Sequence, residues 1–220
     1  MKIVVIGGVA AGMSAAARAR RLSESAQIVV LERSRYLSFA NCGLPYHIGG
    51  DIQDREQLVL QTPQTLAESL NLDVRIGHEV VAINTAEKTI VVRELDTGIK
   101  YFEAYDKLVL SPGAKPIRPP LPGIDHPRIF TLRNIEDMDV IKSKVDEGVS
   151  RVVVIGGGYI GIEMAENLRQ RNIEVVLVEL VEQILSASLD PEMARDMQYH
   201  LQYHGVQLKL GTAASSAVST

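Results

Sequence analysis

Residues 151–179 read RVVVIGGGYIGIEMAENLRQRNIEVVLVE and contain a complete glycine turn between a strand and a helix. The run Arg151–Ile155 is typical of a buried strand, and Gly156–Gly161 forms a G-x-G-x-x-G motif. Such glycines permit a tight bend, let a pyrophosphate approach the backbone and let the helix pack on the strand. Glu179 ends the next strand, where a carboxylate can accept a hydrogen bond from a ribose hydroxyl. The segment predicts a βαβ unit that binds a dinucleotide; the alternative is a glycine turn that only packs.

The first residues of the chain repeat this order of elements. Strands are expected at Lys2–Ile6 and Gln27–Leu31, with a helix of small residues at Ala10–Leu22 between them. The turn at Gly7–Gly12 reads GGVAAG, so Val9 replaces the middle glycine, and Glu32 again ends the second strand. The two turns start 149 residues apart, about the length of one domain. This interval predicts two related nucleotide-binding domains.

The expected fold is α/β, with two Rossmann-like βαβ dinucleotide-binding domains, each built on a parallel sheet. Between the βαβ units, the pattern predicts a helix at Pro63–Leu70 capped by Thr62, and strands at His78–Ile83, Thr89–Glu94 and Leu108–Leu110. We place the domain boundary between residues 115 and 116, because Pro112–Pro127 holds six of the nine prolines and excludes regular structure. A ligand for an SH3-type domain is the alternative for that stretch. Residues 217–220 resemble the start of another strand after Val206–Leu210, so we expect a truncated second domain.

Composition and charge exclude several classes of protein. Of the 220 residues, 46% are hydrophobic and 23% are charged, as in globular domains, and no apolar run approaches the ~20 residues of a membrane span. The net charge of −4 argues against a general nucleic-acid binder, which needs a basic excess. Cys42 is the only cysteine, so neither an intrachain disulfide nor a cysteine-rich zinc site can form. The chain starts with a strand pattern instead of a signal peptide, and we expect a cytoplasmic protein.

Cys42 lies in the segment Ser38–Tyr46, which reads SFANCGLPY. Pro45 fits the first turn of a helix, which places Cys42 at or just before a helix N-terminus. The helix dipole there favours a thiolate over a thiol, and the thiolate is the reactive form. The alternative for a single cysteine is a small, inert residue in the core.

The helix expected after the first glycine turn carries a polar and basic stripe. Ser14, Arg18 and Arg21 recur at the spacing of one helix face. Two guanidinium groups on one face can bind a ligand that carries several phosphates. The alternative is a helix face that only contacts solvent.

Two dinucleotide turns and one cysteine after the first unit resemble the FAD- and NAD(P)-dependent pyridine nucleotide-disulfide oxidoreductases. The segment Ser38–Tyr46 looks like the single-cysteine branch, which holds coenzyme A-disulfide reductases, NADH-dependent persulfide reductases and NADH oxidases or peroxidases. Further segments that match are GGVAAG at 7–12, HEV at 78–80, LSPGA at 110–114 and TLRN at 131–134. The resemblance covers essentially the whole chain. It implies a FAD-binding domain over residues 1–115 and an NAD(P)H-binding domain over residues 116–220.

The resemblance also implies which residues bind each ligand. FAD would contact the first turn, the acid after it and some later positions: Gly7, Gly8, Val9, Ala10, Ala11, Gly12, Glu32, Arg33, Asn41, Cys42, Val80, Ser111, Pro112, Gly113 and Arg133. NADH would contact Gly156, Gly158, Tyr159, Ile160, Gly161, Glu163 and Glu179, with Tyr159 over the flavin until nicotinamide displaces it. Coenzyme A would contact Ser14, Arg18, Arg21, Ser38 and Asn41. A basic residue that some relatives carry near Leu70 is missing here.

The implied function is a FAD-dependent, NADH-using reductase of coenzyme A disulfide, or of persulfide and polysulfide sulfur, with Cys42 as the catalytic residue. With one cysteine, the oxidised form would be a mixed disulfide, a persulfide or a sulfenic acid. Glu179, followed by no Arg within Leu180–Leu185, predicts NADH in preference to NADPH. The full-length protein is expected to be a homodimer with a small-molecule substrate and without a metal, nucleic-acid or membrane partner. The alternatives are an NADH oxidase or peroxidase, which carries a His where this chain has Ala10, and a non-catalytic nucleotide-binding module.

Overall fold

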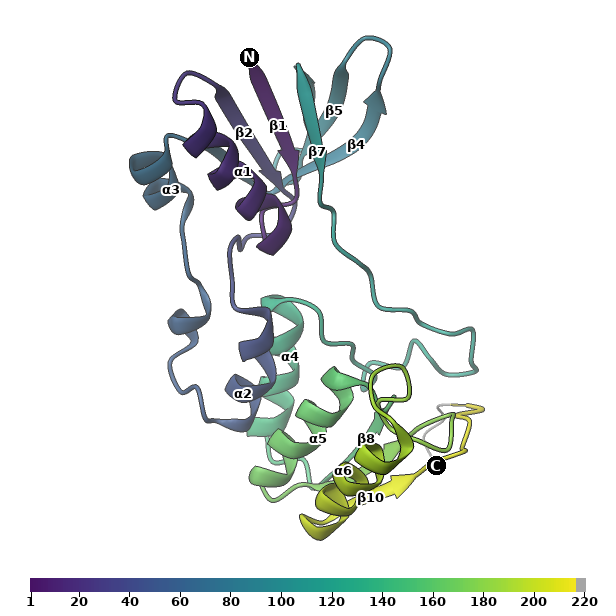
Figure 1. The fold of residues 1–220 in the computed structure, drawn as a ribbon. Coiled ribbons are helices and arrows are strands. Elements are labelled where there is room, and N and C mark those ends of the chain that lie inside the picture. Colours follow the sequence, from purple (N-terminus) through teal and green to yellow (C-terminus); the bar gives the residue numbers. More distant parts are fainter. Residues whose placement is uncertain (217–220) are drawn as a thin grey trace. The chain divides into compact units, whose positions relative to one another are not determined.

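The computed structural model describes residues 1–216, so the predicted strand start at 217–220 lies outside the described residues. The chain divides into two compact units, whose helices and strands are labelled in Figure 1. The first consists of Met1–Ala40 and Glu56–Ala114, and the second of Asn41–Arg55 together with the chain from Lys115 onward. The predicted domains, 1–115 and 116–220, differ from these units in the segment Asn41–Arg55, because its helix packs on two helices of the second unit.

The first unit contains a parallel sheet in the order β3-β2-β1-β7 (Figure 1). Its elements are β1 (Lys2–Ile6), α1 (Ala10–Leu22), β2 (Gln27–Glu32), α3 (Pro63–Leu70), β3 (Asp73–Ile76) and β7 (Lys107–Leu110). The predicted N-terminal βαβ unit is confirmed. So is the helix capped by Thr62, whose hydroxyl oxygen accepts a hydrogen bond from the Thr65 N–H at 3.2 Å. The sequence pattern does not predict β3, because four residues are too few to show a period.

A second, antiparallel sheet in this unit has the order β4-β5-β6. Its strands are β4 (His78–Asn84), β5 (Thr89–Glu94) and β6 (Lys100–Ala104), of which the sequence predicts the first two. The two sheets enclose a core in which Val4 packs with Ile90 and Val92. On the other face of the parallel sheet, Val5 packs in a cluster with Met13 of α1. The alternation of Val4 and Val5 follows from the twofold period of a strand.

The second unit repeats the parallel arrangement with the order β10-β9-β8. Its elements are α2 (Leu44–Gly49), α4 (Ile135–Asp146), β8 (Arg151–Ile155), α5 (Tyr159–Gln170), β9 (Glu174–Val178), α6 (Pro191–Tyr203) and β10 (Val206–Lys209). The predicted βαβ unit and the strand at β10 are confirmed, whereas α4 and α6 are not predicted from the sequence. The expected burial of β8 is wrong, since Val153 and Ile155 are exposed. The proline-rich residues 112–127 contain no helix or strand, as predicted.

Candidate functional site

Each glycine turn needs its first and last glycine for the fold itself. Gly7 and Gly156 have φ angles of +100° and +108°, which residues with a Cβ rarely adopt. A Cβ on Gly12 would lie 1.8 Å from the carbonyl oxygen of Gly7, and a Cβ on Gly161 would lie 1.9 Å from that of Gly156. Because no side chain fits at such distances, the two turns close in the same way, and α1 and α5 begin within them.

The middle positions of the two turns differ. A Cβ on Gly158 would meet no atom within 4 Å, so packing does not require glycine there. Val9 occupies the corresponding place in the first turn, with an ordinary φ of −104°. Space beside the backbone that packing leaves open is what a pyrophosphate needs to reach the N–H groups at a helix start. The second turn therefore fits a dinucleotide phosphate.

The acid after each turn is bound in the same way in both units. The Glu32 carboxylate accepts hydrogen bonds from the backbone N–H of Gly8 at 2.7 Å and of Ser34 at 2.8 Å. The Glu179 carboxylate accepts from Gly157 at 2.6 Å and from Val181, two residues after it, at 3.1 Å. An ionised carboxylate has about four lone-pair sites, so each keeps acceptor capacity for a ribose hydroxyl.

Ser111 joins the first turn at the carboxyl end of the parallel sheet. Its N–H donates to the carbonyl oxygen of Ile6 at 2.8 Å, and its carbonyl oxygen would lie 2.0 Å from a Cβ on Gly7. Its hydroxyl is buried and has no hydrogen-bond partner among the described residues. Buried polar atoms are nearly always paired, so this hydroxyl fits a site that a polar ligand completes.

Cys42 lies where the sequence predicts, directly before a helix. It sits in a short 3₁₀ turn, Asn41–Gly43, and Pro45 occupies the first turn of α2. The thiol is free and exposed, so Cys42 is not a residue of the core. Helix α2 rests on α4 and α5, and a Cβ on Gly49 would lie 2.2 Å from Oδ1 of Asn167 on α5.

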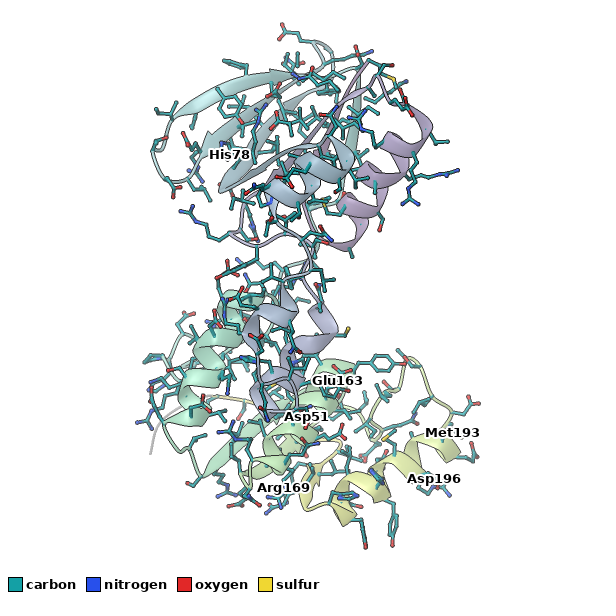
Figure 2. The ribbon with its side chains drawn as sticks, turned by 90° about the vertical axis from the view of Figure 1, so that its left-hand side faces the viewer. Asp51, His78, Glu163, Arg169, Met193 and Asp196 are labelled. Atoms are coloured by element: carbon teal, nitrogen blue, oxygen red, sulfur yellow. The ribbon has the colours of Figure 1, made fainter. Side chains whose placement is uncertain are left out.

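Tyr46 is a functional candidate that the sequence reasoning misses. It follows Cys42 by four residues on a helical segment, a spacing that places side chains on one face. The carboxylate of Glu163, burial of the phenol, and negative charge at Glu166, Cys42 and Asp51 raise the pKa of Tyr46 above its usual range. Figure 2 labels Glu163 and Asp51 in the second unit. The phenol therefore stays protonated, and able to donate a hydrogen bond, to a higher pH than an ordinary tyrosine.

The polar and basic stripe on α1 faces solvent. Ser14, Arg18 and Arg21 are exposed, while Met13 on the opposite side is buried in the core. Arg20 is 9% exposed, and its guanidinium donates hydrogen bonds to carbonyl oxygens at the ends of α1 and α3. Arg20 thus holds the two helices together, and the stripe keeps two guanidinium groups for a ligand.

The predicted ligand residues are divided between the two units. The first unit holds the turn Gly7–Gly12 with Glu32 and Ser111–Gly113 beside it, the exposed Arg33, the half-buried Val80 on β4, and Ser38. The second unit holds Asn41, Cys42 and Arg133 together with all of the predicted NADH residues. Tyr159, at the start of α5, is 60% exposed, and Glu163 follows one helical turn later.

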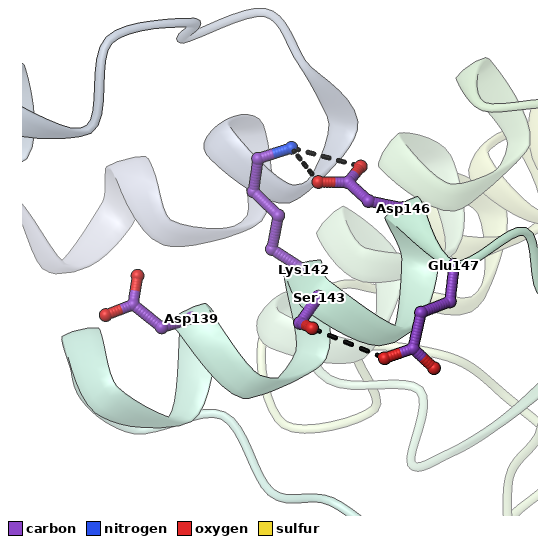
Figure 3. A pocket seen from close by; sticks show the side chains of 5 residues that line it. All are labelled: Asp139, Lys142, Ser143, Asp146 and Glu147. Atoms are coloured by element: carbon purple, nitrogen blue, oxygen red, sulfur yellow. Dashed lines mark hydrogen bonds and ion pairs between the residues drawn. The ribbon is translucent and has the colours of Figure 1, made fainter.

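A surface pocket on α4 carries no comparable chemistry. Figure 3 shows the residues that line it, which are Asp139, Lys142, Ser143, Asp146 and Glu147. Lys142 pairs with Asp146 at 3.0 Å, and Asp139 pairs with Arg55 at 2.7 Å, so the charges satisfy one another. Over residues 1–216, three or more His, Cys, Asp or Glu side chains nowhere gather into a group that could hold a metal ion. In the same range, every helix is too short or too polar to cross a membrane.

Comparison with known proteins gives one family and several close relatives. The family model described as pyridine nucleotide-disulphide oxidoreductase matches residues 1–220. A coenzyme A disulfide reductase of Staphylococcus haemolyticus is 41% identical over 184 residues, which are 83% of this chain and 41% of that protein. The chain thus spans less than half the length of this curated relative.

Two solved structures are similar over almost the whole chain. The structure of reduced Bacillus anthracis CoADR-RHD is 51% identical, with a TM-score of 0.95, over 98% of this chain and 39% of that one. The structure of a NAD-dependent persulfide reductase from A. fulgidus is 36% identical, also with a TM-score of 0.95, over 100% of this chain and 41% of that one. The similarity confirms the predicted dinucleotide-binding fold.

Proposed function

This chain belongs to the pyridine nucleotide-disulphide oxidoreductase family, and on that premise we propose that the protein containing it is a FAD-dependent, NADH-using reductase of coenzyme A disulfide or persulfide. The observation that carries the proposal is the exposed Cys42 thiol at the start of α2, in a unit whose glycine turn fits a dinucleotide. Two of the relatives support it by name, one as a coenzyme A disulfide reductase and one as a NAD-dependent persulfide reductase.

The chemistry follows from a single thiol. FAD, which the first glycine turn with Glu32 and Ser111 would hold, would supply the two electrons for sulfur reduction that NADH provides. The Cys42 thiolate attacks one sulfur of coenzyme A disulfide, so that a Cys42–coenzyme A disulfide forms and the other coenzyme A leaves as a thiolate. The leaving coenzyme A thiolate takes up a proton from solvent water. Two-electron reduction of the mixed disulfide then releases the second coenzyme A and restores the Cys42 thiolate.

The ligands are assigned to the two units by the same proposal. The FAD site is assigned to the first turn with Glu32 and Ser111, and to Asn41, Cys42 and Arg133. The FAD-binding domain is assigned to residues 1–115. NADH is assigned to the second turn with Tyr159, Glu163 and Glu179, within residues 116–220. The stripe of Ser14, Arg18 and Arg21, with Ser38 and Asn41, is assigned to coenzyme A, whose phosphates pair with guanidinium groups. We further propose a cytoplasmic homodimer that has no nucleic-acid or membrane partner.

Mass spectrometry of the unreduced protein tests this function. We expect an adduct with the mass of coenzyme A on Cys42, which dithiothreitol releases, because attack of the thiolate on coenzyme A disulfide leaves a mixed disulfide on this cysteine. A bare thiol on a protein that consumes no NADH with coenzyme A disulfide, coenzyme A persulfide or polysulfide would instead support a nucleotide-binding module without catalysis. The rates of NADH consumption with these three substrates and with oxygen, compared with one another, identify the electron acceptor.

The nucleotide preference is a second expected result. Because backbone N–H groups of Gly157 and Val181 hold the Glu179 carboxylate, its negative charge stays where a ribose 2′ group would lie. We expect kcat/KM for NADH to exceed that for NADPH at least about tenfold, through repulsion of the 2′-phosphate. Glu179→Gln, which removes the charge and keeps an acceptor oxygen, should lower the ratio of kcat/KM for NADH to kcat/KM for NADPH. Equal values for the two cofactors in the unmodified protein would contradict the assignment.

A further inference from the structure

Two residues adopt a positive φ that is rare for their residue types, Ser38 in a bend and Leu185 in a turn. Over residues 1–216, the non-glycine residues with positive φ are Ser38, Asn71, Lys88, Asn172 and Leu185. Asn71 caps α3, Asn172 follows the end of α5, and Lys88 lies in the turn between β4 and β5. Asparagine tolerates this conformation, but serine and leucine rarely adopt it. Ser38 (φ 45°) and Leu185 (φ 49°) therefore need surroundings that hold them in this conformation.

Ser38 and Leu185 occupy equivalent places in the two units. The N–H of Ser38 donates to the carbonyl oxygen of Gly8 at 2.8 Å, and the N–H of Leu185 donates to that of Gly157 at 2.9 Å. Each follows a buried aliphatic residue, Leu37 or Ile184, that packs beneath the same glycine. The same geometry in two units, on segments with different sequences, indicates a shared requirement.

Further hydrogen bonds hold the strained backbone in place. The Ser38 carbonyl oxygen accepts from the N–H of Leu60 at 3.1 Å, and the Leu185 carbonyl oxygen accepts from Ser188 at 2.8 Å and Leu189 at 3.0 Å. A strained conformation persists only where its surroundings determine it from several sides, as they do here.

The bonds from Ser38 and Leu185 complete a clamp on the second glycine of each turn. Glu32 and Glu179 hold the N–H of Gly8 and Gly157, so both backbone groups of each glycine are bound. In a trans peptide the N–H of the next residue points opposite to the C=O. Fixing the Gly8 carbonyl toward Ser38 therefore directs the Val9 N–H away from Ser38. The corresponding bond from Leu185 to the Gly157 carbonyl oxygen directs the Gly158 N–H away from Leu185.

We propose that Ser38 and Leu185 are positioning residues for the two dinucleotides: their positive φ angles orient the turn so that one N–H in each meets a phosphate before any ligand arrives. The inference rests on the proposed function, since it takes FAD as the ligand of the first turn and NADH as that of the second. It gives Ser38 a backbone role in the FAD site, separate from any contact of its hydroxyl with coenzyme A.

Two pairs of variants test the clamp, and the members of each pair differ in how well they tolerate a positive φ. Ser38→Gly and Ser38→Val both lose the hydroxyl, but glycine adopts positive φ freely and a β-branched residue does not. Leu185→Met and Leu185→Ile both keep a large apolar side chain, and only the second is β-branched. For the protein that contains this chain, we measure the Kd of FAD by flavin fluorescence on the apoprotein, the Kd of NADH by titration, and Tm.

The expected result is a crossed pattern. The Kd of FAD should be about tenfold higher in Ser38→Val than in Ser38→Gly, and the Kd of NADH about tenfold higher in Leu185→Ile than in Leu185→Met. The two Ser38 variants should have the same Kd for NADH within about twofold, and the two Leu185 variants the same Kd for FAD, because each clamp acts on one turn. A general loss of folding would instead weaken both cofactors and lower Tm. If Ser38→Val does not fold, Ser38→Ala against Ser38→Gly tests the same order with a smaller difference.

Each remaining outcome decides against one claim. Equal FAD affinities in the Ser38 pair, together with equal NADH affinities in the Leu185 pair, would overturn the positioning role while leaving the proposed function intact. Parallel loss of both cofactors within a pair would also overturn it and assign these residues to folding alone. An unmodified protein that binds neither FAD nor NADH would overturn the proposed function itself.

Discussion

Replacing Cys42 by serine is expected to lower NADH-dependent reduction of coenzyme A disulfide at least about 10³-fold, while FAD stays bound. A serine hydroxyl is not ionised near neutral pH and forms no bond to sulfur that reduction could reverse, so the mixed disulfide cannot form. Cys42 is exposed, and exchange of sulfur for oxygen at an exposed position leaves the fold nearly unchanged. A single-turnover measurement of NADH-dependent thiol release from coenzyme A disulfide checks this expectation.

The control for Cys42→Ser is the flavin content of the purified variant. An unchanged ratio of FAD to protein, with no coenzyme A adduct in the mass spectrum, would show that only the sulfur chemistry is lost. A second control, Tyr46→Phe, keeps the thiol and the ring and removes the phenolic proton. It should slow thiol release less than Cys42→Ser does, because the nucleophilic thiol stays in place. Unchanged turnover in Cys42→Ser would refute the mechanism.

Turnover with hydrogen peroxide or oxygen is expected to be at least about 10²-fold slower than reduction of a coenzyme A disulfide or persulfide. A peroxidase must protonate the departing hydroxide, and the family resemblance implies a His for an oxidase or peroxidase at the position where this chain has Ala10. Ala10 is the first residue of α1, and its methyl group can neither donate a hydrogen bond nor transfer a proton.

The other histidines do not replace it. His47 lies on α2 near Cys42 in sequence, but it is 4% exposed and its Nδ1 lies 2.7 Å from the carbonyl oxygen of Ile52. His78 has Nδ1 2.8 Å from the carbonyl oxygen of Ile76, in the first unit. Both rings are thus engaged by backbone carbonyl groups. His126, His200 and His204 belong to segments outside the glycine turns.

Parallel NADH assays with peroxide, oxygen and coenzyme A disulfide measure this difference. Ala10→His provides the matched variant: restoring an imidazole in the first turn should raise the peroxide rate relative to the disulfide rate. Comparable rates with peroxide and disulfide in the unmodified protein would favour the oxidase–peroxidase alternative over the reductase.

Local sequence was sufficient to predict the two βαβ units. The bounds of β1 and α1 agree with the predicted Lys2–Ile6 and Ala10–Leu22, because apolar runs and small-residue helices signal themselves within a few residues. The strand β6 (Lys100–Ala104) was not predictable in this way. It mixes charged and aromatic residues, and its strand conformation depends on pairing with β5.

The sequence by itself determined the two glycine turns and the acid that follows each. Positive φ at Gly7 and Gly156, and the contact of Glu32 with Gly8, arise between residues at most about one βαβ unit apart. Only the tertiary structure decided that Asn41–Arg55 packs with the second unit, and that Tyr46 lies among carboxylates. Those features depend on contacts between residues far apart in the sequence, such as Arg55 with Asp139, which are 84 positions apart, and no local period or spacing encodes such contacts.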